Sequence, residues 1–160
     1  MIYIDFLSRS PEQTRRIGMH LGGALQMGDV ICLQGDLGAG KTTFVQGIAQ
    51  GWGSLDLVSS PTFILVNVYR RVDESQLFHM DAYRLDSTPE AEELDLDSML
   101  AEGALIVEWP ERMDGLIPNE NLWVNLEYVD DEEREMKFNA SGKRYDELLE
   151  MIRHAMVGGD

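Results

Sequence analysis

The sequence lacks the features that stabilise secreted proteins or anchor a chain in a membrane. It contains one cysteine, Cys32, so it can form neither an internal disulfide nor a thiolate metal cage. No apolar run approaches the roughly 18 residues of a membrane-spanning helix. The first residues include no basic segment and no apolar stretch of signal-peptide length. We therefore expect a cytoplasmic protein with no membrane association.

Basic residues are also scarce. The chain has 13 lysines and arginines against 29 aspartates and glutamates, which gives a formal net charge of −16. The acidic residues concentrate in Glu90–Asp97 and Asp130–Glu135. Because binding to a nucleic-acid backbone needs lysine and arginine to neutralise phosphates, we do not expect tight independent binding to RNA or DNA. The acidic surface serves either solubility or docking onto a basic partner, and the sequence leaves both open.

Hydrophobic periodicity and turn residues predict strands alternating with helices in one domain, residues 1–160. A first helix should begin at Ser10 and close at Gly28. The helix that follows Lys41 should stop at Gly51 and Gly53. Further helices are expected at Thr88–Ala101 and Tyr145–Met156, and strands at Val30–Leu33, Phe63–Arg70, Gln76–Asp81, Ala104–Trp109, Leu122–Tyr128 and Glu135–Ala140. Two of the strand pairs are hairpins, so the sheet should be mixed.

A glycine-rich segment lies between the strand Val30–Leu33 and the next helix. Residues Gly35–Thr42 read Gly-Asp-Leu-Gly-Ala-Gly-Lys-Thr, which matches the P-loop pattern G-x-x-x-x-G-K-[S/T]. In such a loop successive backbone N–H groups surround phosphate oxygens, and the helix N-terminus adds its positive end. The alternative, an incidental glycine-rich turn, does not need a buried strand before it and an amphipathic helix after it. We therefore expect a three-layer P-loop NTPase-like sandwich that binds ATP with Mg²⁺.

The pattern assigns roles to individual side chains. Lys41 would reach the β- and γ-phosphates, the Thr42 hydroxyl would ligate Mg²⁺, and Thr43 would lie toward the α-phosphate. Ser60-Pro61-Thr62 follows the helix, where the Thr62 hydroxyl would meet the γ-phosphate or the metal; a simple turn into the next strand explains it equally well. The predicted nucleotide-binding residues are Asp36, Leu37, Gly38, Ala39, Gly40, Lys41, Thr42, Thr43 and Thr62.

A P-loop ATPase also needs a carboxylate at the end of a neighbouring strand. Glu108 ends the apolar run Ala104–Val107, and Asp81 ends a second strand. We predict Glu108 as the magnesium-side ligand, direct or through water, with Asp81 orienting or deprotonating the attacking water. Lys41, Asp81 and Glu108 are thus the predicted catalytic residues, although each carboxylate alone also fits a surface acid. His79 is expected to be packed or hydrogen-bonded, and Trp109 to stack beside the site or lie in the core.

These motifs together resemble a known family, the small bacterial P-loop ATPases of the TsaE (YjeE) type. The resemblance rests on four segments in order and covers essentially the whole chain, most weakly after Asn119. The segments are Gly35–Thr43, Ser60–Phe63, His79–Arg84 and Val107–Glu111. The departures are Ala82, where the family usually has a larger apolar residue, and the acidic turn Val129–Glu133, which replaces a turn that commonly contains glycine.

The resemblance implies a role in making threonylcarbamoyladenosine on transfer RNA. It implies that Thr42 and Glu108 hold Mg²⁺, that Asp81 and Thr62 act on the switch side, and that Ser10–Thr14 lies near the adenine. The implied partners are the transferase subunit, which carries the threonylcarbamoyl group to adenosine, and its paralogous dimerisation partner. ATP hydrolysis, weak in the isolated protein, would reset that complex between cycles, and tRNA would be contacted only indirectly.

Other functions stay open on the residues alone. A small P-loop kinase would need clustered arginines and a lid, whereas the arginines here are scattered and no lid-sized insertion is visible. A GTPase of the Ras-like class would carry an Asn/Thr-Lys-x-Asp signature, which this sequence lacks. A non-hydrolysing nucleotide-binding adaptor is the third alternative, because no arginine finger or water-orienting glutamine can be assigned.

Overall fold

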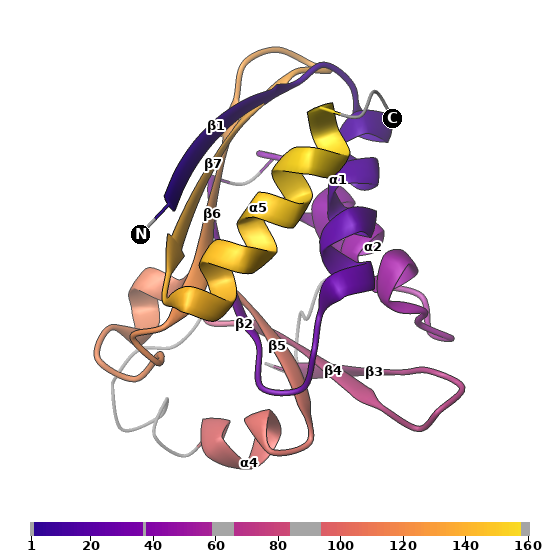
Figure 1. Cartoon of the computed structure of the whole chain (residues 1–160), viewed down its shortest axis with the longest axis vertical. Coiled ribbons are helices and arrows are strands. Elements are labelled where there is room, and N and C mark those ends of the chain that lie inside the picture. The colour runs from indigo at the N-terminus through magenta and orange to yellow at the C-terminus, as the bar shows by residue number, and fades with distance from the viewer. Residues whose placement is uncertain (1, 37, 59–65, 84–93, 158–160) are drawn as a thin grey trace.

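A computed structural model describes residues 2–36, 38–58, 66–83 and 94–157 (Figure 1). The described residues form a seven-stranded sheet in the order β1-β7-β6-β2-β5-β4-β3. The strands are β1 (Ile2–Ser8), β2 (Val30–Gln34), β3 (Val66–Arg70), β4 (Gln76–Asp81), β5 (Gly103–Glu108), β6 (Asn121–Tyr128) and β7 (Arg134–Ser141). The helices are α1 (Pro11–Ala24), α2 (Lys41–Trp52), α4 (Leu96–Leu100) and α5 (Lys143–Val157), with a 3-10 turn, η1, at Pro110–Met113.

The sheet is mixed, as the sequence predicted. Strand β2 runs parallel to β5 and to β6, and β4 runs parallel to β5. The pairs β3–β4, β6–β7 and β1–β7 are antiparallel. The carboxyl ends of β2, β4, β5 and β6 therefore meet at one edge of the sheet, where α/β proteins commonly bind ligands.

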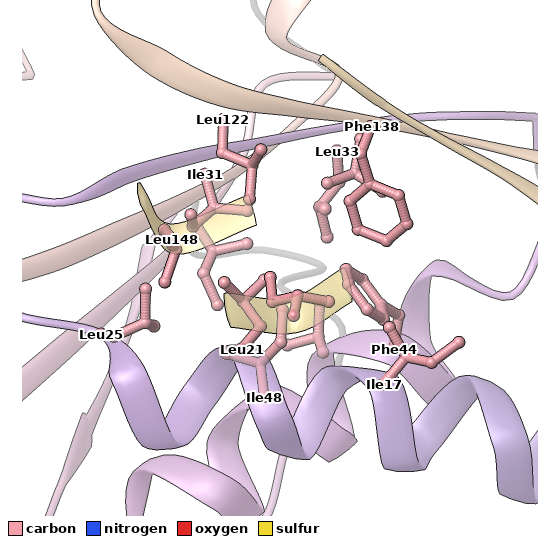
Figure 2. Packing of buried hydrophobic residues seen from close by; sticks show 14 of the residues in the cluster. Ile17, Leu21, Leu25, Ile31, Leu33, Phe44, Ile48, Leu122, Phe138 and Leu148 are labelled. Atoms are coloured by element: carbon pink, nitrogen blue, oxygen red, sulfur yellow. The ribbon is translucent and has the colours of Figure 1, made fainter. Parts of the chain in front are cut away.

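Helices α1, α2 and α5 cover one face of the sheet (Figure 1). Figure 2 shows the core between them and the strands, where α1 contributes Ile17 and Leu21, and Leu25 follows directly after the helix. The alternate side chains of β4 and β5 point to the opposite face. There Phe78, Met80, Leu105 and Val107 pack with Leu96 of α4 and Met113 of η1. This arrangement confirms the predicted layered α/β sandwich.

Helices α1 and α2 approach each other through glycines. A Cβ atom added at Gly18 would lie 2.5 Å from the Phe44 carbonyl oxygen, which is backbone of α2. Gly22 on α1, and Gly47 and Gly51 on α2, likewise face the backbone of the opposite helix at distances that leave no room for a Cβ. The α1 helix thereby supports α2, the helix that begins at Lys41.

An ion pair fastens α5 to the rest of the domain. The guanidinium of Arg144 donates to both carboxylate oxygens of Asp29, at 3.0 and 2.7 Å, and to the Ala24 carbonyl at 2.7 Å. Asp29 is only 4% exposed and also accepts a bond from the Gln26 amide. Elsewhere in the core, burial raises the pKa of the Cys32 thiol to about 12, so this thiol stays protonated.

Several predicted boundaries were wrong. Helix α1 begins as predicted, with the Ser10 hydroxyl accepting the Gln13 amide at 3.1 Å, but it ends at Ala24 instead of Gly28. Helix α2 continues through Gly51, which packs against α1, and only Gly53, with φ of 99°, ends it.

Two further differences concern whole elements. The helix predicted for residues 88–101 is not continuous: within the described residues Asp95 caps a short α4, because its carboxylate accepts the Ser98 amide. Strand β1 was not predicted at all. In the part of the chain described here, no helix has the length and apolarity needed to cross a bilayer.

Candidate nucleotide site

The glycine-rich loop connects β2 to the first turn of α2. Gly38 and Gly40 have φ values of 81° and 96°, a left-handed conformation that L side chains rarely adopt. The Ala39 amide donates to the Asp36 carbonyl at 3.0 Å and closes the turn. Gly40 occupies the N-cap position of α2 and offers no side chain to the first N–H groups of the helix. These free N–H groups can bind an anion.

Lys41 is a buried cationic side chain at the start of α2. It is 6% exposed, and its buried Nζ atom has no hydrogen-bond partner among the described residues. Nζ lies 4.0 Å from the centre of the Trp109 ring. Burial lowers the pKa of Lys41, while the charges of Glu108 and Asp81 oppose that shift. A buried cation without a partner is costly, so this arrangement favours the arrival of an anion.

The two predicted carboxylates come together opposite Lys41. Asp81 and Glu108 end the neighbouring parallel strands β4 and β5 and are register partners. Glu108 is 6% exposed, and its Oε2 atom lies 2.5 Å from Nε2 of His79. Burial raises the pKa of Asp81, and the charge of Glu108 adds to the rise; a hydrogen bond from the Tyr83 amide and the charge of Lys41 act against it. Three ionisable groups thus converge where parallel strands end.

Aromatic side chains border this group. Trp109 follows β5 with a φ of 59°, and its amide donates to the Leu33 carbonyl of β2 at 3.2 Å. The Tyr83 ring packs against the indole with ring centres 4.8 Å apart. The structure therefore places Trp109 beside the candidate site, one of the two positions that the sequence allowed.

The remaining predicted residues are distributed along the loop and helix. Thr42 is exposed on the first turn of α2, Thr43 is half-buried, Asp36 and Gly38 are exposed, and Ala39 is buried. Leu37 and Thr62 lie outside the described residues. The segment Ser10–Thr14 begins α1, and the Thr14 hydroxyl is buried against that of Ser8 at 2.6 Å.

Other residues next to the loop were not assigned from the sequence. Arg134 of β7 donates through Nη2 to the Gly38 carbonyl at 3.1 Å. Its guanidinium lies 4.8 Å from the Tyr128 ring centre. A cavity of about 330 Å³ opens beside the loop, and Gln34, Asp36, Trp109, Glu111, Asn125 and Tyr128 are among its lining residues. The missing signal was strand order: Tyr128 neighbours the loop because β6 pairs with β2, which spacing does not reveal.

The chain is similar to a family of known proteins. Residues 8–136 match the family described as threonylcarbamoyl adenosine biosynthesis protein TsaE. A tRNA threonylcarbamoyladenosine biosynthesis protein TsaE from Bacillus subtilis is 40% identical over 147 residues, which cover 91% of each chain. The protein of the same name from Treponema pallidum is 37% identical over 131 residues, covering 81% of this chain and 96% of the relative.

The chain is also similar to a solved structure. The crystal structure of Bacillus subtilis YdiB superposes with a TM-score of 0.81 at 34% identity and covers 96% of each chain. The family match spans most of the chain and includes the glycine-rich loop, both carboxylates and Arg134. The chain therefore belongs to the TsaE family of tRNA threonylcarbamoyladenosine biosynthesis proteins.

Proposed function

We propose that this protein binds ATP with Mg²⁺ at the Gly35–Thr43 loop and hydrolyses it to support tRNA threonylcarbamoyladenosine modification. One observation carries the proposal: the buried ammonium of Lys41, without a partner among the described residues, at the start of α2 and facing Glu108 and Asp81. The β- and γ-phosphates would supply the negatively charged partner that the Lys41 ammonium lacks. The uncapped N–H groups of α2 would bind the same phosphates.

The carboxylates fit a metal that is held jointly with the nucleotide. Within the described residues no group of three or more His, Cys, Asp or Glu side chains forms a metal site. Mg²⁺ commonly needs only one or two protein oxygens beside substrate phosphates, so the set does not have to be larger. Thr42 and Glu108 would provide these oxygens, and the bound metal would neutralise charge between the phosphates.

Asp81 would orient or deprotonate the attacking water. Its pKa is raised by burial, which makes it a better proton acceptor than an ordinary aspartate. The described arginines nearest the loop have other contacts: Arg134 binds the Gly38 carbonyl, and Arg112 lies over the Tyr83 ring. Because these two arginines have other contacts and are not free to stabilise the transferring phosphoryl group, we expect turnover to be weak in the isolated protein and stimulated by a partner.

Membership of the TsaE family supports a partner within the threonylcarbamoyladenosine modification machinery. We propose the transferase subunit and its paralogous dimerisation partner as the proteins on which ATP hydrolysis acts, in the cytoplasm. The net charge of −16 disfavours direct binding to tRNA, so tRNA would be contacted only through these partners.

Thermal unfolding with and without nucleotide tests the binding site. ATP at ~100 times its dissociation constant, with Mg²⁺, should stabilise the wild type by about 2.7 kcal/mol. Lys41→Ala should abolish this stabilisation without unfolding the protein, and Glu108→Ala should lose more magnesium dependence than nucleotide affinity. A Lys41→Ala variant that keeps the full stabilisation would show that the phosphates bind elsewhere. Phosphorylation of a cosubstrate would instead indicate a small kinase, and binding without any turnover an adaptor.

A further inference from the structure

A buried chain of hydrogen bonds runs from the edge of the sheet to Glu108. The Tyr69 hydroxyl of β3 lies 2.8 Å from Nδ1 of His79 on β4, and Nε2 of His79 lies 2.5 Å from Oε2 of Glu108 on β5. Tyr69, His79 and Glu108 are only 3%, 1% and 6% exposed. We refer to these three side chains as the Tyr69–His79–Glu108 chain.

The direction of these hydrogen bonds follows from the groups involved. An ionised carboxylate can only accept, so Nε2 of His79 carries the hydrogen that Glu108 receives. In a neutral imidazole the other nitrogen must then accept, and the Tyr69 hydroxyl is placed to donate to it. Tyr69 therefore favours the tautomer in which His79 donates to Glu108.

This arrangement fixes one oxygen of the carboxylate and leaves the other available. His79 engages Oε2, whereas no hydrogen bond within the described residues engages Oε1 of Glu108. A carboxylate held in this way keeps its orientation when a cation is absent. Partners of this kind orient metal-binding carboxylates in proteins, and their loss typically weakens metal affinity 10- to 100-fold.

We infer that Tyr69 and His79 are positioning residues that hold Glu108 in the orientation needed to bind Mg²⁺ together with the nucleotide. This inference rests on the proposed function. The opposing explanation is structural: Tyr69 and His79 satisfy each other's buried polar groups and contribute only to stability. The two explanations differ in whether removing the Tyr69 hydroxyl changes magnesium binding.

The decisive variant is Tyr69→Phe, which removes the hydroxyl and keeps the ring. The matched control is Tyr145→Phe, because the Tyr145 hydroxyl is also buried and accepts the Val30 amide at 2.9 Å, but lies on α5. For each protein the shift in melting temperature at fixed ATP is measured while Mg²⁺ is titrated, and again in EDTA. Tyr69→Phe should need about 10-fold more Mg²⁺ for the half-maximal shift, with the shift in EDTA unchanged.

Substitutions at His79 provide a second test in case Tyr69→Phe folds poorly. His79→Gln keeps a side-chain amide that can donate to Glu108, whereas His79→Leu keeps the bulk and loses the donor. His79→Gln should retain a larger part of the magnesium affinity than His79→Leu, and steady-state turnover should show the same order at limiting Mg²⁺.

The outcomes separate the inference from the proposed function. If the wild type shows a magnesium-dependent shift and Tyr69→Phe matches Tyr145→Phe, the positioning role is wrong and the proposed function stands. Equal magnesium affinity in His79→Gln and His79→Leu would also overturn the inference. If the wild type shows no shift with ATP and Mg²⁺, the proposed function fails, and the inference fails with it.

Discussion

The contact between α1 and α2 permits a quantitative prediction about how the helix bearing Lys41 is held. A Gly18→Ala substitution puts a Cβ atom 2.5 Å from the Phe44 carbonyl oxygen, against at least 3.4 Å for an ordinary contact. The difference, 3.4 − 2.5, requires the helices to separate by about 0.9 Å. The neighbouring atoms are backbone atoms of α2, including Ile48 N at 3.0 Å, so no flexible side chain can yield.

The expected cost follows from the packing that this separation disturbs. A gap of ~0.5–1 Å forfeits a quarter to a half of each dispersion contact across it, and overpacking typically costs about 1–3 kcal/mol. Alanine recovers roughly 0.5–1 kcal/mol over glycine in a helix. We expect a net loss of about 1–2 kcal/mol, which corresponds to a fall of about 2–8 °C in melting temperature for a domain of this size.

The neighbouring glycine provides the control. A Cβ added at Gly23, on the same helix, meets Gly51 O at 3.7 Å, an ordinary contact. Gly23→Ala should therefore raise stability by up to about 1 kcal/mol. Both variants are measured by urea and thermal unfolding. If Gly18→Ala is as stable as Gly23→Ala, the close approach of α1 and α2 does not hold α2 in place.

Three further predictions concern the ion pair, the buried lysine and the loop. Arg144→Ala should cost about 3 kcal/mol in urea unfolding because Asp29 stays buried without its partner; a loss below about 1 kcal/mol would contradict this. Burial holds the pKa of Lys41 below its ordinary 10.5, so the folded state binds this proton less tightly than the unfolded state. The contribution of Lys41 to the free energy of unfolding should therefore increase as pH rises toward 10.5. In Lys41→Met the free energy of unfolding, measured at pH 7 and pH 10, should lack this increase. The same change in unfolding free energy with pH in both proteins would refute the prediction. Arg134→Gln should weaken ATP binding about tenfold in calorimetry, since a charged hydrogen bond to the Gly38 carbonyl is lost; unchanged affinity would remove Arg134 from the site.

The elements with strong local signals could be predicted from the sequence. The Ser10 cap, the glycine-rich loop and the strands ending at Asp81 and Glu108 each follow from residues adjacent in the chain. Strand β1 was missed because its apolar alternation is short, and its stability depends on pairing with β7 and on packing of Ile2, Ile4 and Phe6 against the core, which local sequence does not reveal. The predicted helix stop at Gly51 was wrong because local propensity does not reveal that a second helix packs against this residue.

In the candidate site, too, residues that belong to motifs were predicted and residues that depend on tertiary contacts were not. Lys41, Asp81 and Glu108 belong to motifs and were predicted, and the structure brings them together. The contribution of Tyr69 depends on a side-chain hydrogen bond to His79 on the neighbouring strand, although its register partner there is Leu77, and motif spacing does not encode this contact. Long-range register therefore limited the prediction more than residue chemistry did.

Partner-coupled hydrolysis of ATP at the Lys41 site is the activity that we propose. It is tested most directly by measuring Mg·ATP turnover of the purified protein alone and with the transferase subunit and its dimerisation partner, in the wild type and in Lys41→Ala. We predict slow turnover alone, strong stimulation by the two partners, and loss of both in Lys41→Ala. Turnover that the partners do not change, or that persists in Lys41→Ala, would contradict the proposed function.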